Sequence, residues 1–216
     1  MKASHWISKR ILALGGILAL ALPVHAVEIE GVKVDDAVHV ANADLKLNGA
    51  GVRYKLFFKV YVAGLYLPEH KAAVNDVLAI TTPRRISLTM LREVSADTFG
   101  QSFMDGLANN TTVEERSHII NQMLSFGQMF GSYHSLKPGD NVTVDWIPPV
   151  GTVVQLNGKK ISDSLPDIAF YNALLKIWLG DQPADKSLKK ALLGGQSNSK
   201  PDNSKQDSAG KASKSY

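Results

Sequence analysis

The stretch that decides the fold of this chain reads Leu47-Asn48-Gly49-Ala50-Gly51-Val52-Arg53, and it is soon followed by Lys59-Val60-Tyr61-Val62-Ala63-Gly64-Leu65-Tyr66-Leu67. The second stretch is rich in Val, Tyr and Leu, and Pro68 stops it, which predicts a strand. Residues 48–51 are of types that accept positive φ, so they predict a turn between strands at 43–47 and 52–56. The pattern indicates antiparallel β-structure with one Arg in an otherwise apolar strand.

Arg53 and Tyr61 are the polar candidates for a site in this region. In one straight strand they would lie roughly 26 Å apart, at about 3.3 Å per residue, and such a strand would be unusually long. If the chain reverses near Phe57, the two become cross-strand neighbours in contact range. Residues 56–59 contain no Gly, Pro, Asn or Asp, so the local sequence leaves both arrangements open.

The remainder of the chain predicts an α+β domain. Strands precede helices, then come a hairpin around Asn157-Gly158 and two more helices, without a βαβ rhythm. This order predicts a largely antiparallel sheet with helices packed on one face. The expected strands cover 27–34, 59–67, 77–81, 85–91, 141–147, 151–156 and 159–162. The expected helices run from Ser95 to about 107, from Thr111 or Thr112 to about 130, and over 165–179 and 184–193.

The two ends of the chain are predicted to lie outside this domain. Residues 1–26 combine a basic start, an apolar run over 11–22 and a small residue at Ala26, which is typical of a secretory signal cleaved after Ala26. The apolar run is shorter than the roughly 20 residues of a spanning helix, so no stable membrane span is expected after cleavage. Residues 194–216 are dominated by Ser, Lys, Asn and Asp and predict a disordered tail. The domain is therefore 27–193, and the expected localisation is periplasmic or secreted.

Charge and composition exclude several classes of function. Three of the 24 Lys and Arg residues lie in 1–26, which leaves 21 against 20 acidic residues and no concentrated basic face for nucleic acid. The absence of Cys excludes disulfides and Cys-based nucleophiles or metal sites. No two His outside the signal share metal-ligand spacing on one element. Gly49-Ala50-Gly51 precedes a strand rather than a helix, so it is not a dinucleotide motif. We expect no metal and no cofactor.

These motifs carry a resemblance to the chalcone isomerase-like family. Residues 49–53 and 60–67 resemble two adjacent strands of that fold, and Met104-Asp105-Gly106 and residues 173–181 follow in the same order. The resemblance covers about residues 28–193. It implies the open-faced β-sandwich of that family, in a bacterial exported branch related to plant chalcone isomerase and to fatty-acid-binding chalcone isomerase-like proteins.

The resemblance also implies a site. In that family the Arg of the first motif anchors an anionic or phenolate oxygen, and it matches Arg53. The fatty-acid-binding branch pairs this Arg with a Tyr on the next strand, which matches Tyr61. The polar positions of the true isomerases fall instead on Phe99, Gly106 and Ile177. The resemblance thus implies a non-catalytic protein that binds a fatty acid or similar amphipathic acid through Arg53 and Tyr61.

An acyl tail needs an apolar wall. Phe99 and Phe103, spaced i and i+4 on one helix, are expected to provide it. The stripe Met123, Phe126 and Phe130 on the next helix could line the same tail or form plain core.

Two other functions stay open. The first is an intramolecular lyase or isomerase in which Arg53 stabilises an oxyanion and Tyr61 or Tyr66 replaces the missing acid. The second is an envelope protein-interaction module, whose protein partners the sequence does not name.

Overall fold

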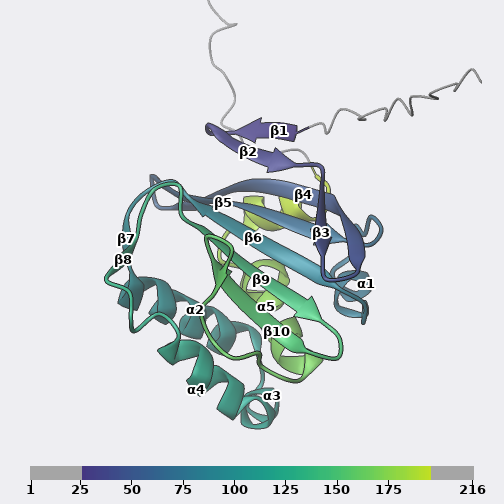
Figure 1. The fold of residues 1–216 in the computed structure, drawn as a ribbon, viewed down its shortest axis with the longest axis vertical. Coiled ribbons are helices and arrows are strands. Elements are labelled where there is room, and N and C mark those ends of the chain that lie inside the picture. The colour runs from purple at the N-terminus through teal and green to yellow at the C-terminus, as the bar shows by residue number, and fades with distance from the viewer. Residues whose placement is uncertain (1–25, 196–216) are drawn as a thin grey trace, which may run out of the picture.

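The computed structural model describes residues 26–195, and Figure 1 shows a curled antiparallel sheet with helices covering one face. Seven strands pair in the order β11-β10-β9-β6-β5-β4-β3. They are β3 (Ala37–Val40), β4 (Ala43–Lys55), β5 (Phe58–Leu67), β6 (Arg84–Met90), β9 (Asn141–Ile147), β10 (Gly151–Leu156) and β11 (Lys159–Lys160). This confirms the predicted α+β class with an antiparallel sheet.

Two short ribbons and six helices complete the described chain. The ribbons are β1 (Ala26–Ile29) with β2 (Val32–Asp35), and β7 (Val94–Ser95) with β8 (Ser135–Leu136). The helices are α1 (Val74–Leu78), α2 (Ala96–Asn110), α3 (Val113–His118), α4 (Ile120–Gln128), α5 (Ile168–Leu179) and α6 (Lys186–Leu192). Within residues 26–195, none of these helices has the length and apolar character needed to cross a membrane.

The central strand β5 is buried on both faces, because every residue from Val60 to Leu67 is buried. Its side chains alternate between two cores. Tyr61 and Leu65 belong to the large core under the helices, with α5 at its centre. Val62 and Tyr66 belong to a smaller core on the other face, which the β1–β2 ribbon covers. The sheet is therefore a partition, and residues of β5 that face α2 and α5 are candidates for an internal site (Figure 1).

The predicted turn at 48–51 is wrong, because β4 runs through it without a break. Asn48 forms a β-bulge instead, where the pairing with β5 shifts register between Leu47 and Gly49. Its amide donates to the carbonyls of Lys71 and Leu192. A Cβ at Gly49 would lie 2.0 Å from the carbonyl oxygen of Ala191. Glycine here permits the close approach of α6 to the strand, which is the other common reason for Gly in a strand interior.

Three further expectations differ from the structure. The expected strand at 77–81 is the short helix α1 and the loop after it. The expected edge strand at 27–34 is a hairpin that turns at Glu30-Gly31, both at positive φ. The expected long helix to about 130 breaks at Ile119, whose φ of −106° and ψ of 14° separate α3 from α4. In addition, the sequence did not predict the short strand β3.

The cap and hairpin signals are confirmed. The side chain of Ser95 accepts a hydrogen bond from the backbone N–H of Thr98 and begins α2. Thr112 and Glu115 form a capping box at the start of α3. Asn157 and Gly158, both at positive φ, connect β10 and β11. The predicted signal up to residue 25 and the predicted tail from residue 196 lie outside the described residues.

Candidate functional site

The chain reverses at Leu56 and Phe57, and this reversal makes Arg53 and Tyr61 direct cross-strand partners. Leu56 adopts a φ of 56°, a left-handed conformation that Gly or Asn usually provides in such turns. Of the two arrangements that the local sequence left open, the structure therefore has the hairpin. The Cζ of Arg53 lies 5.5 Å from the centroid of the Tyr61 ring, within cation–π range.

A second β-bulge re-aims the side chains at this point. Arg53 pairs with Tyr61 while Tyr54 pairs with Lys59, so Val60 is the extra residue on β5. The bulge places both Val60 and Tyr61 in the core under the helices. Bulges of this kind often occur next to binding sites, because they change the direction of a side chain without ending the strand. Arg53 and Lys55, two positions apart on β4, face the same cavity.

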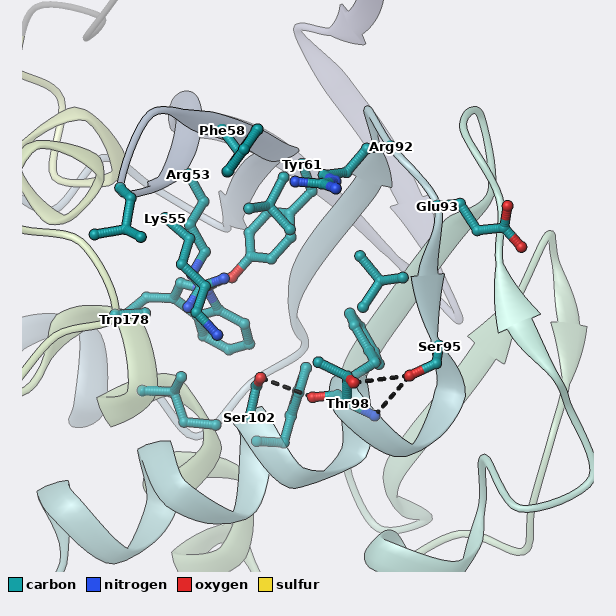
Figure 2. A pocket seen from close by; sticks show the side chains of 17 residues that line it. Arg53, Lys55, Phe58, Tyr61, Arg92, Glu93, Ser95, Thr98, Ser102 and Trp178 are labelled. Carbon is teal, nitrogen blue, oxygen red and sulfur yellow. Dashed lines mark hydrogen bonds between the residues drawn. The ribbon is translucent and has the colours of Figure 1, made fainter.

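That cavity has a volume of about 430 Å³ and opens between the β4–β5 hairpin and α2. The size falls within the range of roughly 300–1,000 Å³ for small-molecule sites. Most of its wall is apolar, and Figure 2 shows the polar groups gathered around Arg53 and Tyr61 and along α2. The full wall comprises Arg53, Lys55, Leu56, Phe58, Val60, Tyr61, Arg92, Glu93, Val94, Ser95, Thr98, Phe99, Ser102, Phe103, Ile177, Trp178 and Ala184.

Arg53 carries an unpaired hydrogen-bond donor beside this cavity. Its Nε is buried and has no hydrogen-bond partner among the described residues. A buried donor left unpaired typically costs about 1–3 kcal/mol. Native proteins pair nearly all such groups, and four other side-chain atoms of the described residues are unpaired in the same way. Arg53 differs from these in lining the cavity, so its guanidinium is the candidate partner for an acceptor that enters there.

The hydroxyl of Tyr61 is oriented by Trp178. The indole Nε1 of Trp178 donates a hydrogen bond of 2.8 Å to the Tyr61 oxygen, and both side chains are buried. Indole can only donate, so the Tyr61 oxygen accepts here and its own O–H proton remains available to another acceptor. Burial raises the pKa of Tyr61, and the positive charge of Arg53 and the bond from Trp178 only partly oppose this. Tyr61 therefore stays a neutral donor at physiological pH.

The helical wall of the cavity contains the two predicted phenylalanines. Phe99 and Phe103 lie on α2 with ring centroids 4.9 Å apart, and Phe103 meets the Trp178 ring edge-on at 5.5 Å. Ile177 of α5 also lines the cavity. A Cβ at Gly106 would lie 2.8 Å from the Ile177 side chain, so these two positions pack against each other. The three positions that the resemblance gives to polar isomerase residues are thus occupied by a phenyl ring, a glycine and an aliphatic chain.

The rim is positively charged and partly apolar. Lys55 and Arg92 are exposed, and the Cζ of Arg92 lies 4.6 Å from the centroid of the Phe58 ring. Figure 2 places Phe58 and Arg92 together, across the cavity from Thr98 and Ser102. The wall contains three cations and one carboxylate, Glu93. The rim can therefore attract an anion toward Arg53.

All four predicted site residues, Arg53, Tyr61, Phe99 and Phe103, thus meet around one cavity. The sequence did not predict a role for Trp178 in the site, although this residue lies within the motif at 173–181. The available signal was a Trp in a buried helix, since a buried indole N–H usually has a partner. The stripe of Met123, Phe126 and Phe130 is buried in the helix–helix core and is not part of the cavity wall.

Metal chemistry finds no support in the described part of the chain. Among residues 26–195 no three His, Asp or Glu side chains are grouped closely enough to hold a metal ion. The chemistry that the cavity offers is hydrogen bonding and charge from Arg53 and Tyr61, with apolar contact elsewhere.

Comparisons with known proteins bear on the fold that carries this cavity. The fold is similar to the crystal structure of a fatty-acid binding protein of Arabidopsis thaliana, with a TM-score of 0.60 and 15% sequence identity. The match covers 78% of this chain and 96% of the plant protein. In all, 38 chains of solved structures match it significantly. At this identity the likeness concerns the fold. A search of curated proteins finds no match.

The family model described as "Chalcone isomerase-like" matches residues 26–194, which is nearly the whole of the described chain. The match includes the β4–β5 hairpin, α2 and α5, the elements that build the cavity. The resemblance inferred from the motifs at 49–53 and 60–67 is therefore confirmed, and the chain belongs to the chalcone isomerase-like family.

Proposed function

We propose that this protein is an exported, non-catalytic binding protein for a fatty acid or a similar amphipathic acid. One observation carries the proposal: Arg53, whose Nε is unpaired, and Tyr61, whose O–H proton is not used by Trp178, line one cavity whose other walls are mostly apolar. A carboxylate accepts both hydrogen bonds. The structural similarity to a plant fatty-acid binding protein supports the ligand class.

The head group and the tail of the ligand are expected to contribute differently to the binding free energy. A hydrogen bond to a charged group nets about 1.5–3 kcal/mol, whereas each buried CH₂ contributes about 0.8 kcal/mol. An acyl tail of ten carbons therefore exceeds the head group several-fold in gross free energy. Arg53 and Tyr61 would set the orientation of the ligand, and the contacts with Phe99 and Phe103 would set most of its affinity.

Apart from Arg53, the positions that the resemblance gives to the polar residues of the family's isomerases carry apolar residues or glycine. Phe99, Gly106 and Ile177 carry no hydroxyl or amide. The remaining acid, Tyr61, has its pKa raised by burial, so it donates a hydrogen bond more readily than a proton. This supports binding over turnover. Export is supported by the secretory pattern of residues 1–26.

The proposal is tested with a matched pair of ligands. Dodecanoic acid and 1-dodecanol share the same tail and differ only in the head group. We expect the carboxylate to bind at least tenfold more tightly at pH 7.5, because only the charged head group can accept from both donors with charge assistance. Calorimetric titration measures both. Equal affinities would show that Arg53 does not recognise the head group of the ligand. If neither compound bound, the cavity would not be a site for such ligands.

A further inference from the structure

The turn that joins β4 to β5 is unusually apolar for its exposure. Phe57 and Leu56 are 93% and 84% exposed, the highest values among the large hydrophobic side chains of residues 26–195. Phe58, the next residue along the chain, is 56% exposed. Leu56 also has a positive φ, where Gly or Asn would be favoured. Neither solvation nor turn geometry explains three consecutive apolar residues here.

This turn, residues 56–58, forms part of the mouth of the cavity. Leu56 and Phe58 belong to the cavity wall, whereas Phe57 is not part of it and is exposed to solvent. The hairpin that carries the turn is the same hairpin that carries Arg53 and Tyr61. Anything that contacts the turn therefore lies at the entrance through which a ligand reaches Arg53.

The charges around the turn are mainly positive. Lys55 and Arg92 are exposed on the rim, and the guanidinium of Arg92 stacks over the ring of Phe58 (Figure 2). Lys59 pairs with Glu30 at 2.6 Å, and Glu93 is the one carboxylate of the cavity wall. The surface thus combines protruding apolar side chains with a flanking excess of cations.

This combination fits the surface of an anionic bilayer. Phe and Leu side chains insert at the boundary between headgroups and acyl chains, while Lys and Arg heads stay at the anionic headgroups. A second copy of the chain fits less well. A symmetric dimer would place the turn and its cations opposite the same turn and cations, and like charges face to face are unfavourable.

We propose that the turn at 56–58 docks this protein on an anionic lipid surface, with the mouth of the cavity against the bilayer. The inference rests on the proposed function, since the docked mouth would let an acid pass between bilayer and cavity without crossing water. Binding through one turn and two or three cations is reversible rather than a stable anchor.

The test compares Phe57→Ser with the matched control Leu124→Ser, each in the exported protein after removal of the predicted signal. Leu124 is also exposed, at 57%, but it lies on α4 and is not part of the cavity wall. Residues outside 26–195 are identical in all three proteins and contribute equally. The probe is a set of extruded vesicles of phosphatidylcholine with 30% phosphatidylglycerol, and flotation measures the bound fraction. Pure phosphatidylcholine vesicles form the second arm.

We expect the unaltered protein to float with the anionic vesicles. Phe57→Ser should lower its partition coefficient about tenfold, and Leu124→Ser should leave it unchanged. Lys55→Gln should lower it about fivefold on anionic vesicles only, because one cation near the surface is removed. Absence of flotation, an equal loss in Leu124→Ser, or a concentration-dependent dimer that Phe57→Ser abolishes would overturn the proposal.

A titration with dodecanoic acid keeps this inference separate from the proposed function. Phe57 lies outside the cavity wall, so Phe57→Ser should retain the dissociation constant for an acid supplied in water while losing vesicle binding. Flotation that depends on Phe57 in a protein that binds no acid would leave the docking surface standing and remove the proposed ligand. Acid binding without flotation would support the proposed function and refute the docking on a lipid surface.

Discussion

The substitution Arg53→Met separates a ligand-binding arginine from a structural one. Methionine keeps most of the apolar stem and removes the guanidinium. Removing the unpaired Nε should return about 1–3 kcal/mol, while the lost cation–π contact with Tyr61 should cost about 0.5–1 kcal/mol. The free energy of unfolding of the ligand-free protein should therefore change by between about zero and +2.5 kcal/mol.

The affinity of the same variant should move in the opposite direction. Loss of a charge-assisted contact of about 1.5–3 kcal/mol predicts dodecanoic acid binding weakened by roughly ten- to hundred-fold. Urea unfolding measures the first quantity and calorimetric titration the second. Lys159→Met, on β11 at the far edge of the sheet, is the control and should change neither.

One result would refute this reasoning. If Arg53→Met destabilised the ligand-free protein by more than about 1 kcal/mol and left the affinity unchanged, Arg53 would be a structural residue. Its orphaned Nε would then have no bearing on a ligand.

Four further predictions follow from individual contacts. Tyr61→Phe leaves the buried Trp178 N–H unpaired, so urea unfolding should show a loss of about 1–3 kcal/mol and titration a several-fold weaker acid affinity; unchanged stability would contradict the assigned bond. Gly49→Ala should destabilise the fold by about 1–3 kcal/mol in the same assay, because its Cβ would meet the Ala191 carbonyl of α6; a neutral effect would contradict that close approach. Asp185 caps α6 with one carboxylate oxygen and accepts the Tyr54 N–H with the other. Asn can still cap the helix but has an NH₂ group in place of the second oxygen, so Asp185→Asn should cost about 1 kcal/mol at pH 7 through the lost bond from Tyr54. Burial raises the pKa of Asp185, but hydrogen bonds from Ser187 and from the backbone outweigh this and lower the pKa below its usual value. The loss of stability in the Asn variant should therefore be constant above about pH 4 and should shrink as the pH falls below that value, because Asp185 of the unaltered protein becomes protonated. A loss of stability that instead grew in acid would contradict the lowered pKa. The protein should convert chalcone no faster than buffer, and absorbance kinetics that show turnover lost in Arg53→Met would favour the isomerase alternative.

Local signals in the sequence predicted much of the fold. Ser95, the Thr112–Glu115 box and Asn157-Gly158 specify their caps and turn by side-chain chemistry that acts within a few residues. The alternation of apolar and polar residues over 141–147 likewise predicted the bounds of β9. These features do not depend on distant parts of the chain, so a single sequence is enough to place them.

The features that the sequence did not predict depend on contacts between distant segments. Residues 48–51 have the composition of a turn, but the carbonyls of Lys71 and Leu192 hold Asn48 in a bulge and α6 packs on Gly49. The reversal at Leu56 takes place without Gly, Pro, Asn or Asp, and Leu56 itself adopts the positive φ there. These local conformations depend on tertiary contacts, which a short stretch of sequence does not reveal.

The candidate site divides in the same way. Arg53 and Tyr61 could be identified from the resemblance, and Phe99 and Phe103 from their helical spacing. The partner of Tyr61 could not, since Trp178 is 117 residues away along the chain and its indole was one of many buried aromatic groups. Likewise, Met123, Phe126 and Phe130 share the composition of the cavity wall, and only the packing assigns them to the core.

The most direct test of the central claim is native mass spectrometry of the protein purified from its own cells without added lipid, followed by extraction and identification of what is released. We predict a bound acidic amphiphile on the unaltered protein and on Leu124→Ser, and its loss from Arg53→Met. A mass without any bound ligand, or a ligand that lacks an acidic group and stays on Arg53→Met, would contradict the claim that Arg53 and Tyr61 hold a carboxylate in this cavity.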